Sequence, residues 1–182
     1  MYIKHSKFKN TGILFEILVK KITGDTLSGK NSKAIKIIKE YFVNTELGKE
    51  YKLYETMFKN MTPVEFLKIT KIADWIHFKA GELITQKGHT VPTLNLIYNG
   101  TVDVVVENKT VAELKDGQFV GEMSFITEKA ATATCKVRHD TECLVWKQEQ
   151  FKELLKRNPS LYFTIQGLLS AQVSNALVSS NK

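Results

Sequence analysis

The stretch Phe119–Thr134, with the sequence FVGEMSFITEKAATAT, holds the residues of this chain that are best suited to bind a ligand. Gly121 precedes a predicted short helix, and a helix start presents free backbone N–H groups and the positive end of a dipole. Glycine has no Cβ, so the backbone can approach a ligand closely there. The Thr132 hydroxyl, at the start of the next predicted strand, can donate to a phosphate oxygen. The pattern predicts an anion site, and the alternative is a helix start that merely closes the fold.

Residue patterns typical of enzymes and metal sites are absent from the sequence. It contains no Ser-His-Asp set, Walker loop or paired-carboxylate motif. Metal-ligand spacing is missing too, because the four histidines are isolated and the two cysteines are eight residues apart. We therefore predict no catalytic residues and no metal. Cys135 and Cys143 are predicted on successive strands and are expected to be buried thiols. A cross-strand disulfide is the alternative if the protein meets an oxidising compartment.

Composition and charge limit the location and the partners. Of the 182 residues, 43% are hydrophobic and 25% are charged, as is typical of globular proteins. No apolar run approaches the roughly 20 residues of a membrane span, and the first residues lack the apolar core of a signal peptide. We expect a cytoplasmic location and no membrane partner. The net charge is +7, and nearly all of the basic residues are lysines; Arg138 and Arg157 are the two arginines. Because arginine makes most of the specific contacts to base edges, this composition argues against sequence-specific nucleic-acid binding.

Hydrophobic periodicity divides the chain into two predicted domains. Residues 1–56 carry helical spacing alone, which predicts an N-terminal extension of two or three helices, the last from Thr45 towards Tyr54. Residues 57–182 begin with a capping box at Thr62 and Glu65 and continue with short alternating strands. Asn99-Gly100 predicts a tight hairpin turn between two of these strands.

The remaining pattern predicts the fold class. Two separate strands are expected over 132–137 and 142–146, followed by helices over 148–157 and from Pro159 onward. Short strands separated by glycine turns indicate a roll or sandwich. The expected class is α+β, with N-terminal helices, an antiparallel jelly-roll-like β-roll and two C-terminal helices.

The segment 119–134 resembles the phosphate-binding cassette of cyclic-nucleotide-binding domains. This family includes catabolite activators, regulatory subunits of protein kinase A and cyclic-nucleotide-gated channels. Residues 80–84 and 96–102 and the paired terminal helices follow in the family's order, so the resemblance covers about residues 57–180. It implies cAMP or cGMP as the ligand, with Glu122 accepting a hydrogen bond from the ribose 2′-hydroxyl. The ligand-binding residues that it implies are Gly121, Glu122, Met123, Ser124, Lys129, Thr132, Ala133 and Thr134.

One position departs from the family pattern. Ala131 stands where the family's arginine pairs with the cyclic phosphate, and Lys129 offers a point charge nearby without the planar guanidinium. The stretch from Leu144 to Pro159 is similar to the Popeye-domain branch, which also lacks this arginine. Two functions stay open: a non-enzymatic regulatory sensor, with weak or altered ligand binding, and a degenerate β-roll that serves as a structural or interaction domain.

Two further predictions concern partners and origin. The apolar seam from Leu161 to Leu177 predicts a homodimer, or a contact with a partner protein, through the C-terminal helix. Residues 4–19 resemble the start of small uncharacterised proteins of marine phages. That second resemblance covers this segment alone and implies no activity.

Overall fold

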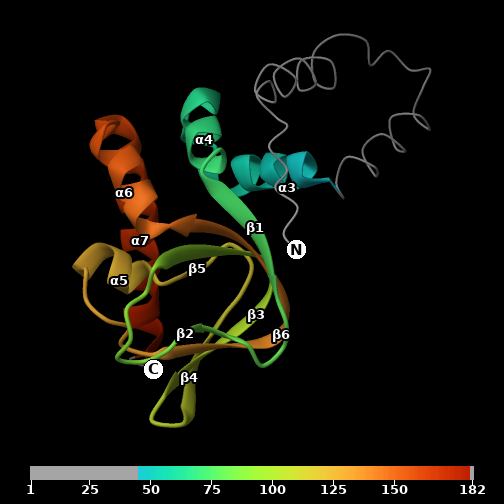
Figure 1. The fold of residues 1–182 in the computed structure, drawn as a ribbon, viewed down its shortest axis with the longest axis vertical. Helices are drawn as coiled ribbons and strands as arrows, with labels where there is room; N and C mark the ends of the chain where they lie inside the picture. The colour runs from blue at the N-terminus through green and yellow to red at the C-terminus, as the bar shows by residue number, and fades with distance from the viewer. Residues whose placement is uncertain (1–44, 181–182) are drawn as a thin grey trace, which may run out of the picture. The chain divides into compact units, whose positions relative to one another are not determined.

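The computed structural model describes residues 45–180 (Figure 1). The chain divides into two units, residues 1–52 and 53–182, and each is described by itself. The helix α3 (Glu46–Leu53), all but the last residue of which belongs to the first unit, begins where the Thr45 hydroxyl accepts a hydrogen bond from the Gly48 N–H, at 3.2 Å. This confirms the helix predicted after Thr45. The helices predicted in residues 1–44 lie outside the described residues, and the domain boundary at 56/57 stays a prediction.

The second unit opens with a π-helical turn, η1 (Tyr54–Phe58), and the helix α4 (Pro63–Thr70). The predicted capping box is confirmed: the Glu65 N–H donates to the Thr62 hydroxyl at 3.2 Å, and the Thr62 N–H donates to the Glu65 carboxylate at 2.9 Å. The Trp146 indole N–H donates to the Ile69 carbonyl at 2.8 Å, so the end of α4 is tied to the sheet.

The strands form one antiparallel sheet, and two of them are long. Their order is β1-β6-β3-β4, with β2 also paired to β6 and β5 to β3. The antiparallel roll with terminal helices that we predicted is therefore confirmed. In the part of the chain that the structure describes, the strands are β1 (Ala73–Phe78), β2 (Leu83–Thr85), β3 (Thr93–Val106), β4 (Lys109–Leu114), β5 (Phe119–Val120) and β6 (Thr134–Lys147).

Alternation along β6 separates two cores. Leu144 and Trp146 pack with the helices in one hydrophobic cluster, while Cys143 and Val145 belong to a second cluster. Successive side chains of a strand point to opposite faces, so one face of the sheet meets the helices and the other lines the inside of the roll. We call the second cluster the interior cluster; its buried members are Ile97, Val102, Val120, Cys135, Val137, Cys143 and Val145.

The predicted hairpin at Asn99-Gly100 is wrong. These residues lie inside β3, where the pairing with β6 shifts register. A Cβ on Gly100 would lie 2.6 Å from the Thr141 Cα, so the glycine serves a close approach between strands. The chain reverses instead at Glu107-Asn108, whose φ angles of 51° and 61° suit a two-residue hairpin of type I′.

The two strands predicted over 132–137 and 142–146 are one strand, β6, which Figure 1 shows running beside β3. Cys135 and Cys143 consequently lie on the same strand, and both are buried and free. A strand rises roughly 3.3 Å per residue, and eight such steps exceed the roughly 7 Å Cα separation that a disulfide tolerates. The cross-strand disulfide is thus excluded, and the buried thiols are as expected.

Two helices, α6 (Gln148–Lys156) and α7 (Pro159–Ser180), follow β6 as predicted. Leu161, Ile165 and Leu169 of α7 are fully buried in the chain's own core. These seam residues are therefore unavailable for pairing two chains. We predicted a dimer because of this seam, and that reason no longer holds. No helix among residues 45–180 is both long and apolar enough to cross a membrane.

Candidate functional site

The predicted cassette starts at the junction of β5 and α5 (Glu122–Thr127), where Gly121 is the N-cap residue. Its φ of +92° lies in the left-handed region, and a Cβ there would be 2.8 Å from the Thr93 carbonyl oxygen. Val91 Cγ1 would be 3.1 Å from the same Cβ. A side chain is thus excluded by both conformation and space, and the backbone packs directly on β3.

The α5 helix is held in place from the outside by α6. Phe125 is buried and contacts Phe151, with ring centroids 5.7 Å apart. Lys152 reaches across from α6, with its Nζ 5.4 Å from the Phe125 ring centroid and 2.7 Å from the Glu128 carboxylate. Glu128 ends α5 in a left-handed conformation, with φ at +59°. These contacts give the short helix a defined position.

The Glu122 carboxyl group is half-buried at the start of α5. Burial raises its pKa, and hydrogen bonds from the backbone of Glu122 and Gly121 oppose that shift. Burial also raises the pKa of the Cys135 thiol, and the Glu122 charge adds to that effect, so the two groups are close. Because Cys135 belongs to the interior cluster, the Glu122 carboxyl group is a hydrogen-bond acceptor near that cluster.

The segment that joins α5 to β6 is anchored by backbone pairing. The Ala131 N–H donates to the His89 carbonyl at 2.9 Å, and the Gly88 N–H donates to the Ala131 carbonyl at 2.8 Å. Ala131 is 8% exposed. Ala131, the position predicted to replace the family's arginine, is thus held by backbone hydrogen bonds on both sides and carries only a methyl group.

Thr85, which the sequence pattern did not single out, organises the next residues. Its buried hydroxyl donates to the Ala133 carbonyl and accepts from the Cys135 N–H, both at 3.2 Å. The Thr134 hydroxyl accepts from the Lys87 N–H at 3.1 Å. The end of β2 thus holds the start of β6. In the sequence, the one hint of this role was a threonine at a position of a short strand that is expected to be buried.

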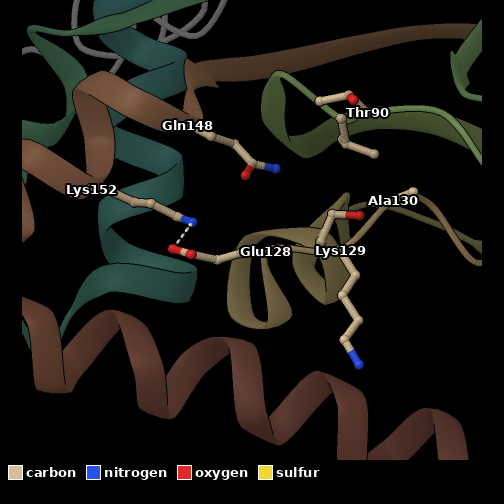
Figure 2. A pocket seen from close by; sticks show the side chains of 8 residues that line it. Thr90, Glu128, Lys129, Ala130, Gln148 and Lys152 are labelled. Atoms are coloured by element: carbon tan, nitrogen blue, oxygen red, sulfur yellow. Dashed lines mark hydrogen bonds and ion pairs between the residues drawn. The ribbon is translucent and has the colours of Figure 1, made fainter.

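Six of the eight predicted ligand residues fall into two groups. The first comprises Gly121, Glu122, Met123 and Ser124 on the β5–α5 junction, and the second comprises Ala133 and Thr134 at the start of β6. Thr132 and Lys129 are exposed, and Figure 2 shows the Lys129 side chain directed away from Thr90 and Gln148. A role for each of the eight in binding stays a prediction.

A small depression opens on the outer side of the cassette (Figure 2). It has a volume of about 170 Å³ and contains the ion pair between Glu128 and Lys152. Ser124 and Lys129 are the two predicted ligand residues that border it; the complete lining is Thr90, Val91, Ser124, Glu128, Lys129, Ala130, Gln148 and Lys152. Glu122 and Ala133 are not in this lining, so the depression is separate from the roll interior.

The C-terminal helix contacts the cassette strand through one side chain. The Phe119 N–H donates to Gln172 Oε1 at 2.7 Å, and Gln172 Nε2 donates to the Phe119 carbonyl at 2.8 Å. The Gln172 side-chain amide thereby satisfies both the backbone N–H and the backbone carbonyl of Phe119. Because Phe119 lies two residues before Gly121, α7 is mechanically linked to the start of the cassette.

Comparison with known proteins supports the family that the cassette resembles. Residues 75–158 match the family model of the cyclic nucleotide-binding domain. A cGMP-dependent protein kinase of Eimeria tenella is 30% identical over 105 residues, which are 57% of this chain and 10% of the kinase. A lysophospholipase of Neurospora crassa is 25% identical over 126 residues, 65% of this chain and 8% of that enzyme. The similarity thus spans a small part of each enzyme.

Solved structures share the fold at low sequence identity. A cyclic nucleotide-binding domain from Methylobacillus flagellatus matches with a TM-score of 0.64 and 20% identity, over 78% of this chain and 81% of that one. The catabolite activator protein of Thermus thermophilus matches with a TM-score of 0.57 and 24% identity, over 68% and 61%. A cAMP-bound PfPKA-R fragment matches with a TM-score of 0.52 and 19% identity, over 79% and 46%. The Popeye and phage resemblances stay predictions.

Proposed function

We propose that residues 57–182 form a regulatory module that binds a cyclic nucleotide inside the roll and has no catalytic activity of its own. The observation that carries this proposal is the junction at Gly121, where a side-chain-free backbone packs on Thr93 and leads directly to the half-buried Glu122 carboxyl group. The Glu122 carboxylate already accepts hydrogen bonds from the Gly121 and Glu122 backbone, so the later N–H groups of the first turn of α5 are those that can serve a phosphate, and Glu122 can serve as an acceptor for a ribose hydroxyl. The family match over residues 75–158 supports the same class of ligand.

The phosphate contacts differ from the family pattern because Ala131 replaces the arginine. The backbone of Ala131 keeps its pairing with Gly88 and His89, so the shape of the segment does not depend on the missing side chain. Loss of a desolvated arginine–phosphate pair lowers affinity by roughly 2–4 kcal/mol, or about 30- to 1000-fold. We therefore expect binding to rest on backbone groups and the exposed Thr132 hydroxyl, at reduced affinity.

A regulatory module also needs a path from the ligand to a partner, and α7 provides one. Gln172 binds the backbone of Phe119, so a ligand that shifts the cassette will also shift or release this helix. On the same helix, Tyr162 and Phe163 are 42% and 72% exposed. We propose these two aromatic side chains as the contact with a partner protein or a second copy of the chain.

Isothermal titration calorimetry with cAMP and cGMP tests the ligand. The unmodified chain, Ala131→Arg and the control Ala130→Arg are compared. Ala130 is exposed whereas Ala131 is buried, so an arginine at 130 starts from the solvent side and should not reach the position that one at 131 reaches. Micromolar or weaker binding by the unmodified chain, tightened at least 30-fold in Ala131→Arg alone, supports the proposal. Absence of heat in all three proteins at millimolar ligand refutes it.

The second candidate function is an interaction domain without a ligand. The exposed pair Tyr162 and Phe163 favours it, because adjacent exposed aromatic side chains are typical of protein contacts. The same titration separates the two candidates. Binding in Ala131→Arg alone would mean that the pocket keeps its shape but has lost its ligand, and the interaction domain would then be the better description.

A further inference from the structure

Asn95 is a polar residue on the apolar inner face of the roll. It lies directly opposite Val120 of β5 and Val145 of β6, and both valines belong to the interior cluster. Residues that pair directly across antiparallel strands share a face, so the Asn95 side chain faces the same interior. It is 1% exposed. Asn95 therefore interrupts the apolar wall beside the strand that leads into Gly121.

One half of the Asn95 amide is bonded and the other is not. Nδ2 donates to the Thr93 hydroxyl at 3.2 Å and to the Val120 carbonyl at 3.4 Å. Within residues 45–180, Oδ1 is buried and has no hydrogen-bond partner. A reversed amide would set its oxygen against the Val120 carbonyl, which cannot donate, so the oxygen is the group that lacks a partner.

A buried acceptor without a donor is unfavourable and uncommon, so the oxygen calls for a donor from outside the protein. Glu122, two residues after Val120, is a second acceptor, and its charge acts on the thiol of Cys135 in the interior cluster. The inner wall thus offers the Asn95 oxygen among valine and isoleucine side chains, with the Glu122 carboxyl group near the same cluster. Such a wall suits a ligand that directs more than one O–H or N–H group inward.

We infer that Asn95 is a specificity-determining residue, whose Oδ1 accepts a hydrogen bond from an O–H or N–H group of the nucleotide bound in the roll. This inference rests on the proposed function. The donor can belong to the ribose or to the base. A ligand that lacks it leaves the Asn95 oxygen unmatched, which is the usual origin of strong discrimination by a buried polar group.

A thermodynamic cycle tests this role. Asn95→Leu removes the acceptor, while the control Thr93→Val removes one partner of Nδ2 and keeps Oδ1. Each variant is made in the unmodified chain and in Ala131→Arg, and is titrated with cAMP, 2′-deoxy-cAMP and the cAMP analogue without the 6-amino group. We expect Asn95→Leu to weaken cAMP binding about tenfold and to leave the analogue that lacks the accepted donor unchanged. Thr93→Val should bind all three within about twofold of its parent.

The outcomes separate this inference from the function on which it rests. Equal discrimination among the three ligands before and after Asn95→Leu overturns it, and the oxygen then serves a buried water alone. An equal loss in Thr93→Val overturns it too, since that would trace the effect to a loosened β3–β5 contact. If Asn95→Leu does not fold, Asn95→Val enters the same cycle. If neither the unmodified chain nor Ala131→Arg binds a nucleotide, both proposals are refuted. If they bind and the Asn95 variants bind equally well, this inference alone is refuted.

Discussion

Gly121→Ala is the sharpest test of the cassette geometry, because the chain contains a matched control. Gly121 and Gly81 have the same φ of +92°. A Cβ on Gly121 would lie 2.8 Å from the Thr93 carbonyl oxygen, whereas a Cβ on Gly81 would meet nothing within 4 Å. Gly81→Ala therefore measures the cost of the backbone conformation alone, and the difference between the variants isolates the close approach to β3.

The expected magnitudes follow from the two physical terms. A left-handed conformation costs an L-residue roughly 1–2 kcal/mol, which we expect for Gly81→Ala. At Gly121 the added methyl group would overlap a backbone oxygen that cannot rotate away. Overpacking of this kind costs about 1–3 kcal/mol more, so Gly121→Ala should lose about 2–5 kcal/mol in total.

Urea unfolding monitored by tryptophan fluorescence measures the difference. Trp75 and Trp146 both lie within residues 53–182, so the signal reports on the unit that carries the roll. The midpoint should fall further for Gly121→Ala than for Gly81→Ala, with the denaturant slope unchanged. Equal midpoints would refute the close approach, and with it the view that Gly121 lets the backbone lie against β3. Nucleotide titration of the folded variants then shows whether the same contact matters for binding.

Three further predictions concern other contacts. Gln172→Ala should lower the free energy of unfolding by about 1–3 kcal/mol and speed amide exchange of Phe119, since both Phe119 backbone groups lose their partner; unchanged exchange would contradict this link. The salt bridge to Lys79 and the Ala80 N–H lower the pKa of Asp140 from 3.8 to about 2, so its contribution to stability is present above pH 4 and is lost as the pH falls towards 2. Acid unfolding of Asp140→Asn should lack this part of the pH dependence, and identical profiles would count against it. Burial raises the pKa of the Cys143 thiol to about 12, so it should resist Ellman's reagent at pH 8 until urea unfolds the chain; rapid labelling of the native protein at Cys143 would disagree.

Much of the candidate site could be expected from local sequence, and part of it could not. Gly121 stands out because a glycine before a helix start is a short-range pattern, whereas the role predicted for Glu122 came from the family resemblance; the structure places both residues at that junction. Thr85, Asn95 and Gln172 carried no such signal. Their roles depend on groups 25 to 53 residues away, which only strand pairing and helix packing bring within hydrogen-bond distance.

The seam of α7 shows a similar limit. Apolar spacing at Leu161, Ile165 and Leu169 predicted a buried stripe, and the stripe is buried. The sequence did not say which surface covers it. A helix can bury the same face against its own sheet or against a second chain, and both satisfy the same periodicity. In this structure the chain's own core covers it, which leaves Phe163 on the exposed side.

By itself, the sequence determined the type of most elements: the capped helix at Thr62, the strands with alternating apolar residues, and a glycine where the cassette begins. Tertiary structure decided where the chain turns. Asn99-Gly100 has the composition of a hairpin turn, yet it lies within a strand, and the turn forms at Glu107-Asn108. The physical reason is that glycine and asparagine tolerate a positive φ but do not by themselves make the chain turn. Whether that freedom serves a reversal or a close approach depends on the partner strand, here at Thr141, which lies 41 residues further along the chain.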